Sequence, residues 1–120
     1  ARRNKAAAYY DAFFKDMPRV KTPARAKNST HVFHQYTLKI DGIKQFEMQE
    51  FLHTKGVPAM IYYPVPIHTQ KAYGPERFNH ADFPVTNELC QTVISLPMHT
   101  ELGDDQLAHI CESVKAYLTA

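Results

Sequence analysis

The sequence has little of what a secreted, disulfide-stapled or membrane-bound protein needs. Only two of its 120 residues are cysteines, four are glycines and none is tryptophan. Two cysteines are too few for a disulfide framework, and Cys90 and Cys111 both lie in apolar helical patterns, which indicates free buried thiols in a reducing cytoplasm. No apolar run reaches the ~18 residues of a membrane span, and the basic, alanine-rich start does not resemble a signal peptide. We therefore expect a cytoplasmic protein that does not enter a membrane.

The charge of the chain gives little support to a nucleic-acid partner. The net charge is only +2. Residues 1–27 carry eight Lys or Arg and two acids, whereas the remainder carries six basic and ten acidic residues. Such a distribution fits a basic arm that binds phosphates, and it also fits a solvated helix face followed by a linker. We favour the second interpretation.

Motifs for nucleophilic catalysis or metal binding are also missing. The sequence contains no Gly-x-Ser-x-Gly motif and no glycine-rich phosphate loop. It has seven histidines, but His31 and His34 would point to opposite faces of a strand, and no other pair has metal-site spacing. His53 and His109 fall on predicted helices, where we expect them at the surface. Residue chemistry alone therefore indicates a binding or assembly domain without a metal.

The first half of the chain predicts a helix, a strand and a second helix. Apolar residues at helical spacing predict a helix from the start of the chain to Met17. The stretch from Pro18 to Thr30 is polar and contains two prolines, so it is predicted to be a loop. Alternating apolar and polar residues predict a strand from His31 to Ile40. A helix follows up to Lys55, with Gly56 as its C-terminal cap.

The second half of the chain adds two strands and two helices. We predict a strand at Val57–Tyr63, an irregular loop from Val65 to Phe83, a short helix over Asn87–Thr92 capped by Thr86, a strand at Val93–Leu96 and a closing helix from Asp104. Three short strands interleaved with helices predict an α+β fold, in which helices pack mainly on one face of a small sheet. A length of 120 residues fits one domain spanning residues 1–120.

The loop after the second predicted strand is the one stretch whose composition suits a ligand. Between residues 62 and 73 it holds three tyrosines together with His68 and Gln70, on a backbone that prolines stiffen. Tyrosine and histidine offer flat surfaces with polar tips, which suit a sugar. The alternative is a loop that only buries its tyrosines against the sheet.

This loop resembles the signature of a known enzyme family. Residues 62–73 read Tyr-Tyr-Pro-Val-Pro-Ile-His-Thr-Gln-Lys-Ala-Tyr, which is similar to the Tyr-Pro-x-Pro-aliphatic-His-x-Gln-x-Ala-Tyr motif of DegT/StrS-type sugar aminotransferases. These are fold-type I enzymes that depend on pyridoxal phosphate. The resemblance extends over essentially the whole chain, through residues 31–36, 51–57, 83–86, 94–99 and 104–117. It implies the C-terminal small domain of such an enzyme, with a small antiparallel sheet of about three strands.

The resemblance also implies what this chain does not contain. In the family, a large N-terminal domain holds the pyridoxal phosphate and supplies the lysine that forms a Schiff base with it. No part of this sequence matches that domain. We therefore expect no catalytic lysine, no bound cofactor and no activity in the chain alone. Lys71 is the only lysine in the loop, and its neighbours do not match the family's cofactor lysine.

Substrate and partners are implied in the same way. The loop is similar to that of members that aminate the 3-keto position of UDP- or dTDP-linked sugars, including a UDP-linked 2-acetamido-2-deoxy-3-oxo-glucuronate used for bacterial surface polysaccharide. His68, with Tyr63 and Gln70, would then line the sugar site. The implied partners are an amino donor such as glutamate, the large domain and a second subunit of a homodimer. A stand-alone carbohydrate-binding or oligomerisation module remains the alternative.

Overall fold

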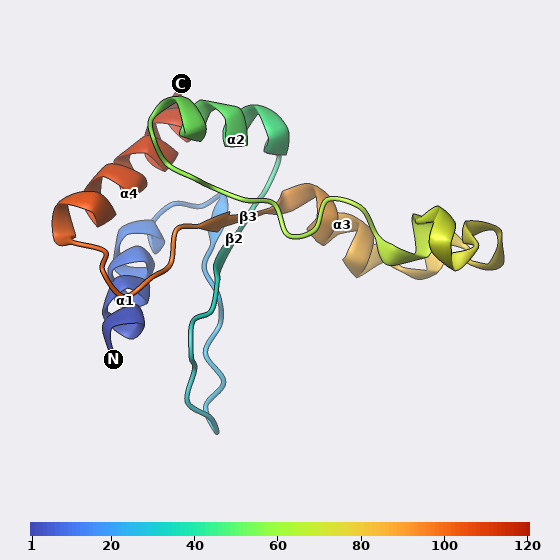
Figure 1. The fold of residues 1–120 in the computed structure, drawn as a ribbon, viewed down its shortest axis with the longest axis horizontal. Helices are drawn as coiled ribbons and strands as arrows, with labels where there is room; N and C mark the ends of the chain where they lie inside the picture. The colour runs from blue at the N-terminus through green and yellow to red at the C-terminus, as the bar shows by residue number, and fades with distance from the viewer.

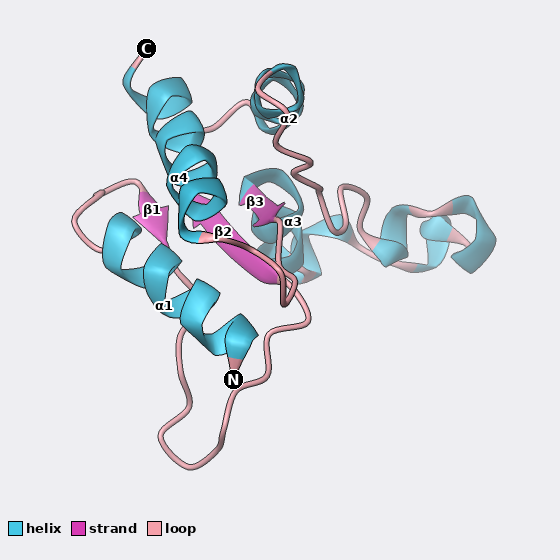
Figure 2. Cartoon of the chain, turned by 60° about the vertical axis from the view of Figure 1, so that its left-hand side comes forward, coloured by secondary structure: helices cyan, strands magenta, loops and turns pink.

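A computed structural model describes all 120 residues and shows an α+β fold, as the sequence predicts (Figures 1 and 2). Four helices surround a three-stranded antiparallel sheet with the strand order β1-β2-β3. The helices are α1 (Arg2–Phe14), α2 (Gln45–Thr54), α3 (Pro84–Thr92) and α4 (Asp104–Thr119). The strands are β1 (Val20–Lys21), β2 (Tyr36–Ile40) and β3 (Val93–Leu96).

Most of the core lies on one face of this sheet. Side chains of β2 alternate, so that Tyr36, Leu38 and Ile40 are buried while Thr37 and Lys39 face the other side. Helices α1, α2 and α4 supply ten more residues of a core of 19 buried residues, and β1, β3 and the connecting segments supply the others. Helix α3 contributes no buried residue and lies on the opposite face, where Glu88 accepts a hydrogen bond from Lys39. The prediction that helices pack mainly on one face is therefore confirmed.

The end of α2 and the start of α4 lie where the sequence predicts them. Gly56 takes a left-handed conformation with φ +74° and ends α2, its amide donating to the carbonyl of His53 at 2.9 Å. Helix α4 begins at Asp104 as predicted, and the side-chain oxygen of Gln106 accepts a hydrogen bond from the amide of Gly103 at 3.0 Å. The two acids of its first turn, Asp104 and Asp105, complement the positive end of the helix.

The strands differ from the prediction in three places. The predicted loop contains β1, a two-residue strand whose Val20 pairs with Ile40. Residues 31–35 are not a strand, because β2 begins only at Tyr36. The predicted strand over residues 57–63 makes only an isolated bridge, in which Met60 exchanges two hydrogen bonds with Ser95 at 3.0 and 2.7 Å. Pro58 has no amide hydrogen to donate, which limits pairing before that bridge.

Two helix boundaries also differ. Helix α1 ends at Phe14, and the chain turns before reaching Met17. Helix α3 starts at Pro84 with Phe83 at its N-cap, so the prediction that Thr86 caps it is wrong. The fixed φ of Pro84 is already suited to the first helical position, and the helix begins there.

Residues 62–83, which we call the arm, project from the body of the domain (Figure 1). The arm consists largely of four short 3-10 helices: η1 (Ile67–Thr69), η2 (Lys71–Tyr73), η3 (Pro75–Arg77) and η4 (His80–Asp82). The radius of gyration of the chain is 15.7 Å, whereas a compact domain of this length would have about 14 Å. The arm is thus ordered but lies apart from the core. None of the helices is both long and apolar enough to cross a membrane.

Candidate functional site

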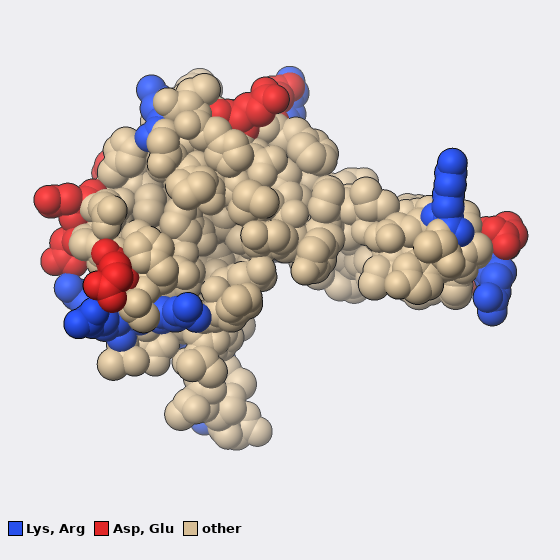
Figure 3. All heavy atoms as spheres, viewed as in Figure 1, with Lys and Arg blue, Asp and Glu red and all other residues tan.

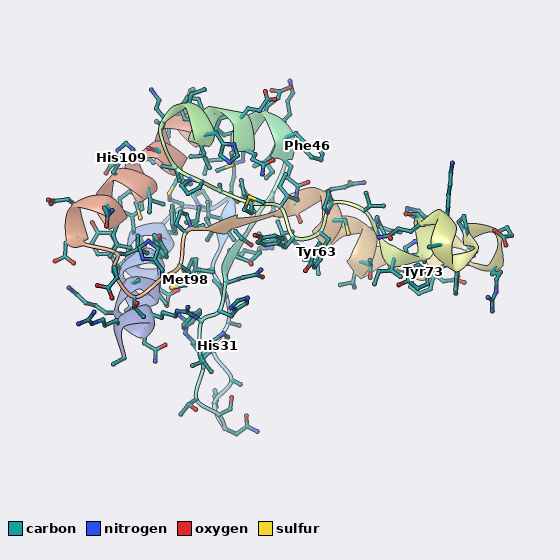
Figure 4. The ribbon with its side chains drawn as sticks, in the orientation of Figure 1. His31, Phe46, Tyr63, Tyr73, Met98 and His109 are labelled. Carbon is teal, nitrogen blue, oxygen red and sulfur yellow. The ribbon has the colours of Figure 1, made fainter.

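The structure places the three predicted sugar-site residues along the arm, but not in one cluster. Tyr63 lies at its root and is 73% exposed, with its ring against that of Tyr62 at 5.6 Å (Figure 4). His68 lies on η1 and is only 8% exposed. Gln70 follows η1, and its side chain donates to the carbonyl of Val65 at 3.4 Å. The fold therefore gathers His68 and Gln70 near one another, while Tyr63 faces solvent at the point where the arm leaves the body.

Contacts within the arm itself bury His68. Its ring stacks on Phe83 with centroids 4.3 Å apart and an interplanar angle of 19°. Its Nε2 lies 3.0 Å from Nδ1 of His80. Phe83 in turn meets Phe78 edge-to-face at 6.3 Å. These aromatic rings form a small cluster that folds the outward and returning halves of the arm together.

The backbone of the arm is held by short-range hydrogen bonds. The carbonyl of Pro66 accepts hydrogen bonds from the amide of Thr69 at 3.0 Å and from its hydroxyl at 2.8 Å, which closes η1. Between η2 and η3, Gly74 has φ +66°, and a Cβ there would lie 2.8 Å from a carboxylate oxygen of Glu76. A side chain at position 74 would therefore strain the turn. The arm has a defined shape, as the prolines of its sequence suggest.

The surface of the arm is largely apolar and aromatic. The loop does not bury its tyrosines against the sheet, because Tyr63 and Tyr73 are both more than half exposed. The exposed apolar side chains continue from the arm onto α3: Tyr63, Val65, Ile67, Tyr73, Phe78, Val85 and Leu89. Charges on the arm gather toward its tip (Figure 3). A contiguous exposed apolar surface of this kind marks a place that a ligand or another part of a protein covers.

A cavity of about 210 Å³ lies at the root of the arm, beside β3. His34, Gln35, Met60 and Tyr62 line it, together with Ser95 of β3. His34 and Gln35 reach this place because the chain bends before β2, which sequence reasoning did not foresee. The sequence signal was the polar pair itself, two residues that break the apolar alternation just before the strand.

The lysines of this chain lie almost entirely at its surface. A lysine that forms a Schiff base must present an uncharged amine, which proteins favour by burying it. Eight of the nine lysines are exposed, including Lys71 on the arm. The ninth, Lys39, is half-buried and donates to Glu88 at 2.6 Å, and this hydrogen bond raises its pKa.

The other titratable clusters are structural or lie at the surface. No group of three or more His, Cys, Asp or Glu side chains is arranged to hold a metal ion. His53 and His109 are exposed, as predicted, and their Nε2 atoms meet the carbonyls of Ala59 and Lys55 at 3.0 and 2.7 Å. Cys90 and Cys111 are both free thiols, but only Cys111 is fully buried.

The basic residues near the start of the chain are largely paired. Arg2 binds Glu101 at 2.8 Å and Lys5 binds Asp104 at 2.9 Å, which ties α1 to the start of α4. Arg25 pairs with Asp11. These pairs favour the solvated helix face over a basic arm that binds phosphates.

Comparison with known proteins relates this chain to one enzyme family. The profile of the DegT/DnrJ/EryC1/StrS aminotransferase family matches residues 1–115. A "Pleiotropic regulatory protein" of Geobacillus stearothermophilus is 33% identical over 82% of this chain and 26% of its own length. The UDP-2-acetamido-2-deoxy-3-oxo-D-glucuronate aminotransferase of Pseudomonas aeruginosa is 34% identical over 95% of this chain and 30% of its own length.

The crystal structure of S. venezuelae DesV in complex with a ketimine intermediate superposes with a TM-score of 0.89 and 25% identity. That match covers 99% of this chain and 32% of DesV. The sheet, its covering helices and the arm thus have the architecture of an aminotransferase domain. The chain belongs to the DegT/DnrJ/EryC1/StrS aminotransferase family, and it spans about a third or less of the length of the relatives it matches.

Proposed function

We propose that this chain is the C-terminal small domain, residues 1–120, of a pyridoxal-phosphate-dependent aminotransferase that aminates a keto sugar linked to a nucleotide. The observation that carries the proposal is the arm, an ordered aromatic loop whose sequence follows the family signature. The substrate is a UDP- or dTDP-linked 3-keto sugar, and UDP-2-acetamido-2-deoxy-3-oxo-glucuronate is our first choice. The name of the P. aeruginosa relative supports this choice. The amino sugar would be made in the cytoplasm and would be used for the synthesis of bacterial surface polysaccharide.

The arm supplies the sugar-binding residues in this proposal. His68 presents an imidazole to a sugar hydroxyl or carboxylate, and Gln70 and Tyr63 line the same sugar elsewhere along the arm. Aromatic faces with polar tips suit a pyranose ring, which has apolar faces and hydroxyls at its rim. The apolar surface of the arm supports its being covered in the parent enzyme by the large domain or by the second subunit of a homodimer.

The cofactor belongs to the rest of the parent enzyme. Pyridoxal phosphate supplies the electron sink for transamination, and the exposure of eight of the nine lysines supports placing its Schiff-base lysine outside residues 1–120. This domain therefore contributes to binding the sugar and not to holding the cofactor. Glutamate is the amino donor that we propose for the parent.

A direct test is an amination assay with the full-length parent, UDP-2-acetamido-2-deoxy-3-oxo-glucuronate and glutamate. We expect formation of the 3-amino sugar and 2-oxoglutarate, and no turnover with residues 1–120 alone. Turnover of the corresponding 4-keto sugar in preference to the 3-keto sugar would contradict the proposed substrate class. Absence of transamination with any nucleotide-linked keto sugar would contradict the proposed function.

A second candidate is a stand-alone carbohydrate-binding or oligomerisation module, which the exposed arm would also suit. Calorimetric titration of residues 1–120 with UDP-N-acetylglucosamine separates the two. A small domain that contributes only part of a sugar site should show no saturable binding, whereas an independent module should bind the sugar nucleotide without other parts of an enzyme.

A further inference from the structure

Two histidine rings meet inside the arm, although they come from different turns. His68 lies on η1 and His80 begins η4, twelve residues later. Nε2 of His68 lies 3.0 Å from Nδ1 of His80, and the ring centroids are 5.1 Å apart at an angle of 44°. At this distance one nitrogen carries the proton and the other accepts it. In two neutral rings the bond couples the tautomers: if Nε2 of His68 donates, its Nδ1 is a free acceptor, and if Nε2 accepts, its Nδ1 carries the proton.

The other nitrogen of His68 has no partner within the protein. No protein hydrogen bond reaches its Nδ1. Nδ1 is also not among the buried side-chain atoms that lack a partner, which are only Arg3 Nε and Asn87 Oδ1. It therefore keeps contact with solvent although the His68 ring is largely buried. Nδ1 is therefore the polar atom of the His68 ring that the protein leaves without a partner.

His80 itself is held by its neighbours. Its carbonyl accepts hydrogen bonds from Asn87 Nδ2 of α3 at 2.8 Å and from the amide of Phe83 at 3.2 Å. The side chain of Asn79 caps the same turn by accepting from the amide of Ala81 at 3.1 Å. The imidazole of His80 is thus attached to a backbone that α3 fixes. The ring of Phe83, which follows η4, stacks on the ring of His68.

We propose that His80 is a positioning residue for His68: through its Nδ1 it fixes the ring orientation of His68, so that Nδ1 of His68 faces the bound nucleotide sugar. This inference rests on the proposed function, because it takes His68 to be a sugar-binding residue. Stacking on Phe83 alone would hold the plane of the His68 ring, but the ring could still turn over and exchange Nδ1 for a carbon. The bond to His80 prevents that exchange. The second imidazole therefore keeps a hydrogen-bonding atom directed at the ligand.

The substitutions at position 80 distinguish this role from simple packing. Asn carries its polar atoms near the position of the histidine Nδ1 and can either donate or accept. Gln carries them farther out, nearer the position of Nε2. His80→Asn should therefore restore the bond, whereas His80→Gln and His80→Ala should lose it, although Gln is closer to histidine in volume.

The experiment is steady-state kinetics of the full-length enzyme with each variant. For His80→Ala and His80→Gln we expect KM for the nucleotide sugar to rise about tenfold, the effect of one hydrogen bond, with kcat changed by less than about threefold. His80→Asn should stay within about threefold of the unaltered enzyme in both. Equal kinetics in all three variants, or a rank order that follows side-chain volume, would overturn the proposal.

A spectroscopic measurement keeps the test independent of turnover. The ring nitrogens of His68 can be observed by NMR in the full-length protein labelled with ¹⁵N-histidine, and assigned from their loss in His68→Ala. We expect the ¹⁵N shift of His68 Nε2 to be that of a hydrogen-bonded nitrogen in the unaltered protein and in His80→Asn, and to change when the bond is lost in His80→Ala. An unchanged His68 spectrum in His80→Ala would refute the positioning role even if the enzyme is inactive. If His68→Ala leaves KM unchanged, the proposed sugar site fails instead.

Discussion

Tyr36 of β2 donates a hydrogen bond to Oδ1 of Asp11 on α1 at 2.6 Å, and Oδ2 of the same carboxylate pairs with Arg25. The tyrosine ring is fully buried and lies 4.8 Å from that of Tyr10. One carboxylate thus connects the first helix, the central strand and the segment that leads into it. The guanidinium of Arg25 also lies 4.2 Å from the ring centroid of Phe33, which fixes that segment on the body of the domain.

Removal of this hydroxyl should lower the stability of the domain. Tyr36→Phe keeps the ring but leaves Asp11 with one partner fewer, so we expect a loss of about 1 kcal/mol in the free energy of unfolding. Urea denaturation followed by circular dichroism measures it. Tyr9→Phe is the matched control, since Tyr9 lies on α1, the helix that carries Asp11, and makes no side-chain hydrogen bond within the protein. An equal loss in both variants would show that the Asp11 contact is not responsible.

The isolated chain should fold cooperatively and then self-associate. Its 19-residue core is contributed by helices and strands of the whole chain, which predicts a single unfolding transition. The apolar surface of the arm is exposed and should hold copies together. Thermal denaturation and light scattering measure the two effects. Replacing Ile67 and Val85 by Asp should reduce the association without changing the transition by more than about 1 kcal/mol, because both side chains lie outside the core. A gradual, non-cooperative transition would contradict the prediction.

Stability should fall at alkaline pH. Burial raises the pKa of the Cys111 thiol to about 12, whereas an unfolded thiol titrates near about 8.5. Above that value the unfolded chain releases a proton that the folded chain retains, so the free energy of unfolding decreases as pH rises toward about 12. Burial raises the pKa of Tyr10 and Tyr36 in the same direction.

Urea denaturation at about pH 7.5, 9 and 10 tests this expectation. Cys111→Ala should be less stable at every pH but should lose less stability between about pH 9 and 10 than the unaltered chain. Cys90→Ala is the control and should keep the original slope, because Cys90 is only partly buried. A free energy of unfolding that rises with pH over this range would contradict the assignment.

The isolated chain should not form an internal aldimine with pyridoxal phosphate. Its lysines are exposed apart from Lys39, which Glu88 binds. Incubation with pyridoxal phosphate, followed by borohydride reduction and peptide mapping, should give only scattered, substoichiometric labelling. The full-length parent should instead be labelled at one lysine outside residues 1–120. Stoichiometric labelling of one lysine in the isolated chain, Lys71 included, would contradict the proposal that the cofactor is held outside residues 1–120.

Loss of the His68 side chain should reduce catalysis in the full-length parent more than it reduces stability. We expect kcat/KM for the nucleotide sugar to fall roughly ten- to hundredfold in His68→Ala, as loss of one substrate hydrogen bond predicts. The partners that bury His68, Phe83 and His80, belong to the arm and not to the body of the domain, so the free energy of unfolding of the body should change by less than about 1 kcal/mol. His109→Ala, on α4 and far from the arm in Figure 4, is the control and should retain full activity. A marked loss of stability with unchanged kinetics would make His68 a purely structural residue.

The sequence by itself determined the elements whose signals are local. The alternation from Tyr36 to Ile40, the left-handed Gly56 and the acids at Asp104 and Asp105 each lie within a few residues of the structure they specify. The family signature in residues 62–73 is equally local, and it indicated the aminotransferase family without any knowledge of the fold.

Only the tertiary structure decided the features that depend on distant partners. Strand β1 has two residues and exists because the edge of β2 offers hydrogen bonds to Val20, while residues 57–63 find only Ser95 to pair with. The contact between His68 and His80 likewise needs the arm to fold back on itself, which brings Phe83 and η4 beside η1. Hydrogen bonds between segments far apart in the chain leave no periodic trace in either segment, so propensity and spacing do not reveal them.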